Sequence, residues 1–173
     1  MRAGSAVEND RHLPHVHPMR TSGPADGLRI RRDVVAIETT CRVEFLDITG
    51  RIEQFVRQCA IGEGMVVISS LHSTCSVLIN EFQHALTTDM ATFLERLAPR
   101  DIGWSHNDPE CSDCDRMNAD AHLRALLLGP AVTVQVAGGE LVLGRWQRII
   151  LAELDGARVR HVSLQAWDLQ PIA

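Results

Sequence analysis

The chain has 173 residues, 45% of them hydrophobic and 23% charged, which is the composition of one soluble globular domain. The net charge of −5 argues against nucleic-acid binding, and no apolar stretch reaches the about 20 residues that cross a bilayer. All 17 basic residues are arginines, which excludes a Schiff-base lysine and a Walker-type phosphate lysine.

The first part of the chain differs in composition from the rest. Residues 1–27 contain Pro14, Pro18 and Pro24 and show no periodic apolar pattern, so we interpret them as a flexible extension. Residues 28–173 are then expected to form a single domain. The five cysteines are odd in number and no secretory signal is evident. We therefore expect a cytoplasmic protein without a disulfide framework.

The first half of the domain alternates strand-like and helical patterns. Residues 34–48 are β-branched and alternating, which predicts one or two strands, and Thr49 is placed to cap a helix over residues 51–59. Strands are predicted at residues 65–70 and 75–80, separated by a polar break at residues 72–74.

The second half begins with two helices and continues as sheet. Helical spacing predicts a helix over residues 85–97, and Asn118 is placed to cap a second over residues 119–128, with Gly129 after it. Asp155-Gly156 between two strand-like runs predicts a β-hairpin. Further strands are expected at residues 131–136, 140–144, 145–154 and 157–167. The order predicts an α+β fold, a mixed and largely antiparallel β-sandwich with about three helices.

Three histidines lie at the ends of predicted elements. They are His72, after a strand, His106, in the polar segment before the third helix, and His122, one turn after Asn118. Each could be a hydrogen-bonded core residue. Together, three neutral imidazoles suit a zinc ion with an open fourth position. Alternatively, His106, Cys111, Cys114 and His122 could form a closed structural zinc site, or the two thiols could simply be free.

Carboxylates and arginines near these segments are candidates for the rest of a site. Glu81 ends one predicted strand and Glu153 ends another that is otherwise apolar, so we expect them to handle protons as catalytic residues. Arg158 follows the predicted hairpin and could bind a phosphate or carboxylate, or form a cross-strand ion pair.

Several motifs in a fixed order carry a family resemblance. The segments "LHSTCSVLINE", "HND", "NADAHLRALLLG" and "GELVLGRWQRIILAELDGAR" resemble the YjbQ family, also called the UPF0047 family, over about residues 28–165. The resemblance implies a mixed β-sandwich that assembles as a homotrimer. It maps the family's motif histidines onto His72, His106 and His122, and its Asn-Glu pair onto Asn80 and Glu81.

Departures from the family pattern lie close to the expected site. A thiol, Cys75, ends the "HSTC" segment where the family commonly has alanine, and His84-Ala85 stands where Asp-Pro is common. The final motif reads "DGAR", without its usual proline.

Two functions of different classes follow. The resemblance implies a secondary thiamine-phosphate synthase activity, a metal-assisted transfer on a small phosphorylated substrate bound by Asn80, Asn118 and Arg158. The alternative is a non-catalytic metal- or ligand-binding trimer in which the same histidines hold the ion.

Overall fold

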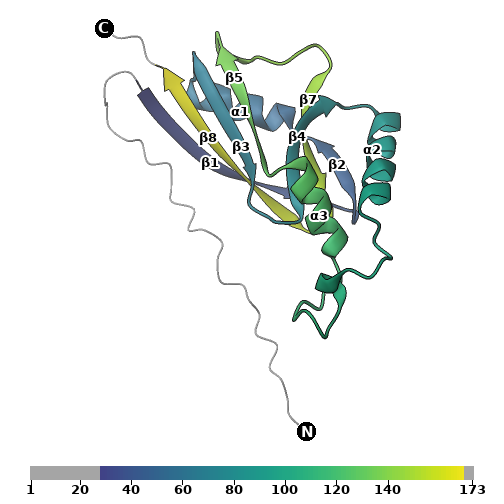
Figure 1. Ribbon diagram of the computed structural model, residues 1–173. Helices are drawn as coiled ribbons and strands as arrows, with labels where there is room; N and C mark the ends of the chain where they lie inside the picture. The colour runs from purple at the N-terminus through teal and green to yellow at the C-terminus, as the bar shows by residue number, and fades with distance from the viewer. Residues whose placement is uncertain (1–27, 170–173) are drawn as a thin grey trace.

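The computed structural model describes residues 28–169, which form two antiparallel sheets and three α-helices (Figure 1). The expected α+β fold is thereby confirmed, whereas the expected extension at residues 1–27 lies outside the described residues. The strands are β1 (Leu28–Glu38), β2 (Glu44–Asp47), β3 (Gly64–Ser70), β4 (Cys75–Glu81), β5 (Ala131–Ala137), β6 (Glu140–Leu141), β7 (Gln147–Glu153) and β8 (Val159–Leu169). The helices are α1 (Thr49–Cys59), α2 (His84–Leu97), α3 (Ala119–Leu128) and the short 3₁₀ helix η1 (Ser105–Asn107).

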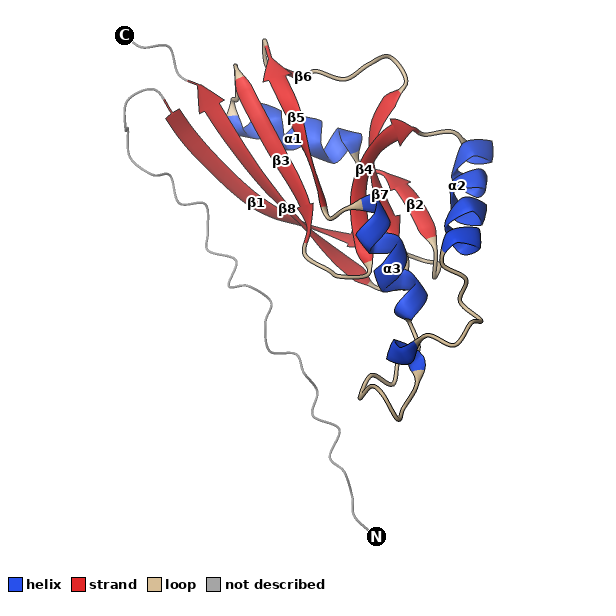
Figure 2. Ribbon diagram, in the orientation of Figure 1, coloured by secondary structure: helices blue, strands red, loops and turns tan. Residues whose placement is uncertain are grey.

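The strands divide into a five-stranded sheet, ordered β1-β8-β3-β5-β6, and a three-stranded sheet, ordered β2-β7-β4 (Figure 2). The main core lies between the sheets and includes one face of α1, with Ile52, Phe55 and Val56 buried. A second cluster lies on the other face of the three-stranded sheet, where Leu94 of α2 and Ala121 of α3 pack against Ala152. Because β7 is covered on both faces, its sequence is a nearly continuous apolar run.

The predicted Asp155-Gly156 hairpin is wrong. β7 belongs to the three-stranded sheet and β8 to the five-stranded sheet, so residues 154–158 carry the chain from one sheet to the other. Asp155 is buried in this connection, where its carboxylate accepts hydrogen bonds from several side chains. The turn therefore owes its conformation to tertiary contacts of Asp155 and not to pairing of the flanking strands.

Two predicted helix caps also differ from the structure. The hydroxyl of Thr49 accepts a hydrogen bond from the amide of Ile149, and the carboxylate of Asp47 accepts the amide of Thr49 at the start of α1. The side chain of Asn118 makes no cap hydrogen bond, because its amide group donates to Asp155 at 2.8 Å. In both cases a long-range partner has replaced the local one. No helix within residues 28–169 is long and apolar enough to span a membrane.

Candidate functional site

His106 and His122 form a pair at the start of α3. The centres of their rings lie 5.0 Å apart in an edge-to-face arrangement, with His106 supplied by η1 and His122 by the second turn of α3. The Nδ1 atom of His106 lies 3.5 Å from the Ser112 hydroxyl. Its Nε2 atom is buried and has no hydrogen-bond partner within the described structure. A buried imidazole nitrogen without a partner is available to a ligand or ion.

The electrostatic surroundings keep His122 neutral. Burial lowers the pKa of His122 below its ordinary value of 6.5, and the charge of His106 acts in the same direction. The carboxylates of Asp155 and Asp120 oppose this shift. Because a metal ion binds the unprotonated imidazole, the lowered pKa leaves His122 ready to coordinate at neutral pH.

His72 forms a different pair, with His161 of β8. The two rings stack with centres 5.8 Å apart, and the Nε2 atom of His72 accepts the amide N–H of His161 at 2.7 Å. Burial, followed by the charges of Arg160 and His161, lowers the pKa of His72, which agrees with a neutral ring that accepts this bond. The Nε2 atom is thus engaged with the backbone and must leave it before it can bind a metal ion.

Glu153 is the last residue of β7 and is fully buried. One oxygen accepts the amides of Leu154 and Asp155, and the other accepts the hydroxyl of Thr39, while both contact the buried guanidinium of Arg160. Arg160 also donates to the hydroxyl and carbonyl of Thr74. With its lone pairs engaged in this way, the carboxylate of Glu153 supports the turn between the sheets.

Asp155 is surrounded by cationic side chains. Its carboxylate contacts Arg42 at 2.7 Å, Arg116 at 3.1 Å and Arg158 at 3.3 Å, and it accepts Asn118 as well. Arg42 also contacts the buried Asp120 at 3.1 Å. The side chains of Arg42, Arg116 and Arg158 are 28%, 49% and 32% exposed, so each retains surface that an anion can reach. We call these three residues the arginine cluster.

Asn80 and Glu81 lie away from the histidines. In the pairing of β4 with β7, Cys75 is opposite Glu153 whereas Glu81 is opposite Gln147. Glu81 is six positions after Cys75 along the strand, which corresponds to about 20 Å. Within one chain, the expected Asn80 and Glu81 therefore occupy the opposite end of the three-stranded sheet from Glu153, and Glu81 is exposed.

The cysteines of the sequence motifs differ in their surroundings. Burial raises the pKa of Cys75 to about 11, so this thiol remains protonated and is a poor nucleophile or metal ligand. Cys111 is exposed, and the Cys114 thiol lies 3.8 Å from the side-chain oxygen Oδ1 of Asn118. Within residues 28–169, no group of three or more His, Cys, Asp or Glu side chains is arranged to hold a metal ion. A single chain thus offers the His106–His122 pair as the nucleus of such a site.

Sequence patterns do not single out several residues of this region. Arg160 and His161 lie in β8. The alternating pattern of this strand predicts which side chains face inward and which face outward, but not which residues they contact. Asp155 was interpreted as a turn residue, and Arg42 and Arg116 lie in segments without a periodic pattern. For Arg116 there is a local signal, the high density of arginine and aspartate in residues 113–124, which contain Asp113, Asp115, Arg116, Asp120 and Arg124.

Comparison with known proteins places the chain in a family. A family model described as "UPF0047 protein YjbQ-like" matches residues 33–168. A UPF0047 protein of Archaeoglobus fulgidus is 40% identical over 134 residues, which cover 76% of this chain and 98% of the relative. The UPF0047 protein YugU of Bacillus subtilis is 34% identical over 128 residues, covering 72% of this chain and 89% of the relative.

Solved structures show the same architecture. A YbjQ-like protein of unknown function from Sulfolobus solfataricus superimposes with a TM-score of 0.76 at 33% identity, covering 82% of this chain and 99% of that one. The hypothetical protein APE1520 from Aeropyrum pernix gives a TM-score of 0.70 at 33% identity, covering 77% and 95% of the two chains. The chain is a member of the YjbQ-like UPF0047 family.

Proposed function

We propose that the protein is a metal-assisted enzyme that acts on a small phosphorylated substrate. The observation that carries the proposal is the His106–His122 pair, which lies in the same region as the arginine cluster around Asp155. The charge of Asp155 acts on His122, which places the two groups within electrostatic reach of each other. A divalent ion and a phosphate could therefore occupy adjacent positions.

His106 and His122 would supply two of the three protein ligands that a catalytic zinc ion requires. We propose His72 as the third, contributed by the same chain or by a neighbouring subunit. In either case its Nε2 atom must exchange the His161 amide for the ion. When bound, such an ion would act as a Lewis acid on a phosphate oxygen.

The arginine cluster would hold the phosphate. Three guanidinium groups contact two carboxylates, Asp155 and Asp120, so their positive charge exceeds the negative charge that they contact. Guanidinium groups bind phosphate oxygens through paired N–H donors, and Asp155 fixes the orientation of these donors before the substrate arrives. Asn118 would orient the substrate through the side-chain N–H that does not donate to Asp155. Asn80 lies at the other end of the three-stranded sheet, so it would contact the substrate only from a neighbouring subunit.

Thiamine-phosphate synthesis is the first reaction to test, because the family resemblance implies it. This transfer expels pyrophosphate, and the positive charge of the arginine cluster would stabilise that leaving group. Glu81 is exposed and could handle a proton at a site that spans two subunits. The buried Glu153 would instead act indirectly, by holding Arg160 and the amides of Leu154 and Asp155 in place.

A non-catalytic metal- or ligand-binding trimer is the second candidate. The observation that favours it is that the Glu153 carboxylate accepts hydrogen bonds at both oxygens, which leaves it without a free lone pair for proton transfer. Binding of zinc and phosphate without turnover of any phosphorylated substrate would support this candidate.

The test is the metal content of His122→Ala, with His84→Ala as the matched control. His84 is exposed at the start of α2, so its loss should leave zinc bound. His122→Ala should lose most of its zinc by mass spectrometry and should lose transferase activity, while circular dichroism shows an intact fold. Full zinc content in His122→Ala contradicts the proposed site. If the wild-type chain binds zinc but shows no transferase activity, only the enzymatic part of the proposal is contradicted.

Arg158→Ala separates phosphate binding from metal binding. Because the guanidinium of Arg158 is one of three in the arginine cluster, its removal should weaken inorganic phosphate binding while zinc content is unchanged. Isothermal titration calorimetry with phosphate provides the measurement. Unchanged phosphate affinity would remove Arg158 from the proposed substrate site.

A further inference from the structure

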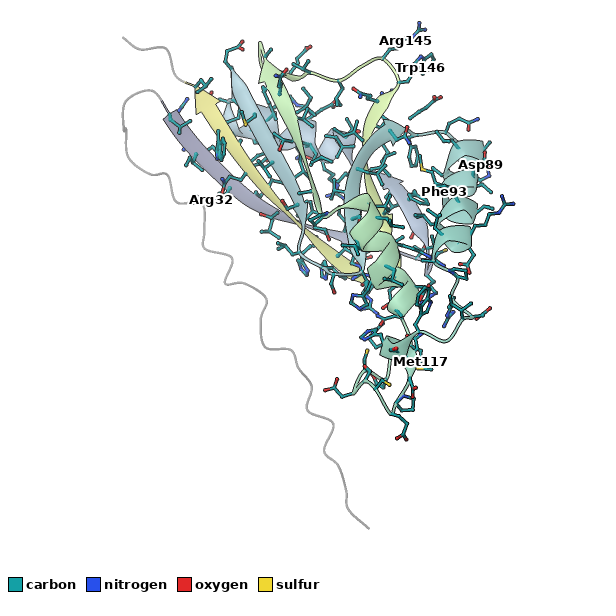
Figure 3. All side chains as sticks on the ribbon, viewed as in Figure 1. Arg32, Asp89, Phe93, Met117, Arg145 and Trp146 are labelled. Carbon is teal, nitrogen blue, oxygen red and sulfur yellow. The ribbon has the colours of Figure 1, made fainter. Side chains whose placement is uncertain are left out.

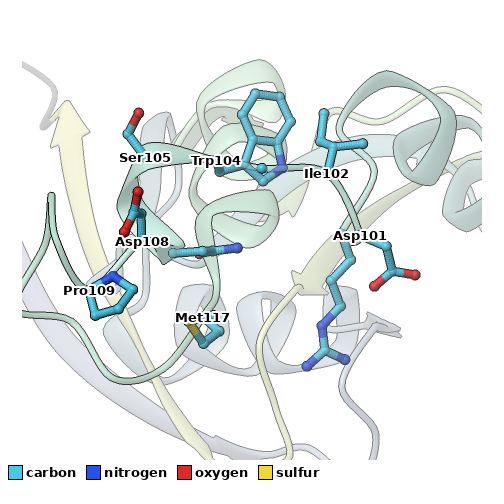
Figure 4. A pocket seen from close by; sticks show the side chains of 10 residues that line it. Asp101, Ile102, Trp104, Ser105, Asp108, Pro109 and Met117 are labelled. Carbon is cyan, nitrogen blue, oxygen red and sulfur yellow. The ribbon is translucent and has the colours of Figure 1, made fainter.

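A groove lies next to the histidine pair and is not used in the proposed function. It has a volume of about 580 Å³ and is lined by residues of the segment between α2 and α3 (Figure 4). Its apolar wall is formed by Ile102, Trp104 and Met117. Its rim carries two carboxylates, those of Asp101 and Asp108. The η1 turn that carries His106 also supplies Ser105 and Asn107 to the lining.

The walls of the groove are held in place by specific bonds. The indole Nε1 of Trp104 donates to the carbonyl of Pro99 at 2.8 Å, which fixes the plane of the ring. Asn107 accepts the amide of Ala119 at 3.0 Å, so the floor is tied to the start of α3. Met117 has a φ of 52°, an uncommon conformation for a residue with a side chain. Its neighbours Arg116 and Asn118 both bond to Asp155.

Large apolar side chains remain exposed in this groove despite its fixed walls. Ile102 is 49% exposed and Met117 is 47% exposed, and Figure 3 shows Met117 at the end of the molecule formed by residues 100–118. An indole face together with a thioether forms a surface suited to a flat ring, because aromatic rings and sulfur pack favourably against one another. The dimensions and the chemistry of the walls therefore fit a small planar molecule.

The charges at the rim select among planar molecules. Asp101 and Asp108 contribute two carboxylates, and Arg100 is the cation among the lining residues. Arg100 therefore balances one of the two carboxylates, and its charge also acts on Glu95, which accepts its backbone N–H. The groove thus presents net negative charge to a ligand, which favours a cationic or donor-bearing ring over an anionic one.

We propose that the groove formed by Ile102, Trp104 and Met117 binds a planar ring that carries a cationic or hydrogen-bond-donating group. The ring stacks on Trp104, and its donor group faces Asp101. This site is independent of the metal and of the transfer reaction.

The experiment uses three probes of the same shape and different charge: benzamidine, benzamide and benzoate. The chain has three tryptophans, so the Trp146→Phe, Trp167→Phe double variant reports on Trp104 alone. Metal is removed by dialysis against a chelator, so that no zinc at the histidine pair can hold a probe. We expect saturable quenching of Trp104 fluorescence, with benzamidine binding roughly fivefold more tightly than benzamide and benzoate binding most weakly.

Two variants assign the binding to the groove. Trp104→Leu in the otherwise unchanged chain should abolish benzamidine binding in calorimetry, whereas Trp146→Leu, at an exposed tryptophan elsewhere, should leave it unchanged. Asp101→Asn should remove the preference for benzamidine over benzamide. Asp108 is less suitable because it accepts the amide of Glu110 and supports the loop.

Several results would overturn the proposal. Equal affinity for the three probes, non-saturable quenching, or undiminished binding by Trp104→Leu would each exclude a ring site in the groove. A change of Trp104 fluorescence with protein concentration alone would show that a second copy of the chain covers the groove. Loss of zinc binding in His122→Ala with intact benzamidine binding would support this proposal and the metal site separately.

Discussion

The carboxylate of Glu153 accepts five hydrogen bonds, including those from Thr39, Leu154, Asp155 and its ion-pair partner Arg160. Both members of the ion pair are almost completely buried. Removal of one partner of a buried pair leaves the other charge without compensation, which typically costs about 3–5 kcal/mol. The pair is therefore expected to hold the connection between the two sheets together.

Glu153→Gln tests this role. The substitution keeps the shape of the side chain but removes the charge that balances Arg160, so the free energy of unfolding should fall by about 3–5 kcal/mol in urea denaturation. Glu53→Gln is the control, because Glu53 is 46% exposed and its pair with Arg57 at 3.8 Å contributes less than about 0.5 kcal/mol. Equal stability of the two variants would contradict the structural role of Glu153.

His72 should make the stability depend on pH. Burial and the charges of Arg160 and His161 lower its pKa in the folded chain, whereas the unfolded chain titrates near 6.5. As the pH falls through 6.5, the unfolded state binds more protons than the folded state. The free energy of unfolding therefore decreases, until the pH passes the lower pKa of the folded state.

His72→Gln should reduce this decrease between pH 7.5 and pH 5.5. The amide oxygen of glutamine can accept the His161 N–H in place of the imidazole nitrogen, but it does not titrate. The control is His84→Gln, at an exposed position, which should keep the wild-type pH dependence. Guanidinium denaturation at several pH values gives the measurement, and an unchanged pH dependence in His72→Gln would show that another group is responsible.

At the scale of elements, local patterns predicted helices and strands but not their partners. The spacing of Ile52, Phe55 and Val56 reflects the single buried face of α1, so this helix is visible in the sequence. The Asp155-Gly156 turn has the same local signal as a hairpin, yet β7 and β8 join different sheets. The pairing of strands depends on contacts between residues far apart in the sequence. The segments on either side of Asp155-Gly156 do not encode those contacts locally, which explains why the hairpin prediction is wrong.

The same limitation applies to the candidate site. His106 and His122 flank the start of α3, so sequence distance and helix geometry together bring them close. His72 instead meets His161, a residue 89 positions away in an ordinary alternating strand, and nothing local distinguishes it. Asn80 and Glu81 lie on the same strand as Cys75, but at its opposite end.

Gly64 shows how closely two strands approach within the five-stranded sheet. It has a φ of 155° and pairs with Asp168, and a Cβ atom at this position would lie 1.9 Å from the carbonyl oxygen of Trp167. Both the φ and the contact exclude a side chain unless the backbone of β3 or β8 moves. Glycine is therefore required at the start of β3.

Gly64→Ala should lower the free energy of unfolding by about 3 kcal/mol, from the clash together with the strained backbone. Gly62→Ala is a matched control two residues earlier, where a Cβ atom meets nothing within 4 Å. It should change stability by less than about 1 kcal/mol. Thermal unfolding of the two variants provides the comparison, and similar melting temperatures would contradict the close approach of β3 and β8.

At the scale of the whole molecule, the helices leave apolar surface uncovered. Leu126 and Leu127 of α3 are 78% and 60% exposed, and Phe93 and Leu97 of α2 are 60% and 51% exposed. Figure 3 labels Phe93 on α2. Exposed apolar side chains on two neighbouring helices are typical of a protein–protein interface.

We therefore propose that these helix faces form the subunit contact of the homotrimer that the family resemblance implies. Light scattering should give a mass three times that of the 19.1 kDa chain, independent of concentration in the micromolar range. Phe93→Asp combined with Leu126→Asp should shift the mass toward that of a single chain, because each buries a charge in the contact. Val142→Asp, at a 51% exposed position in the loop before β7, is the control and should leave the trimer intact. A wild-type mass of one chain at every concentration would contradict the trimer, and with it any site that needs Asn80 or Glu81 from a neighbouring subunit.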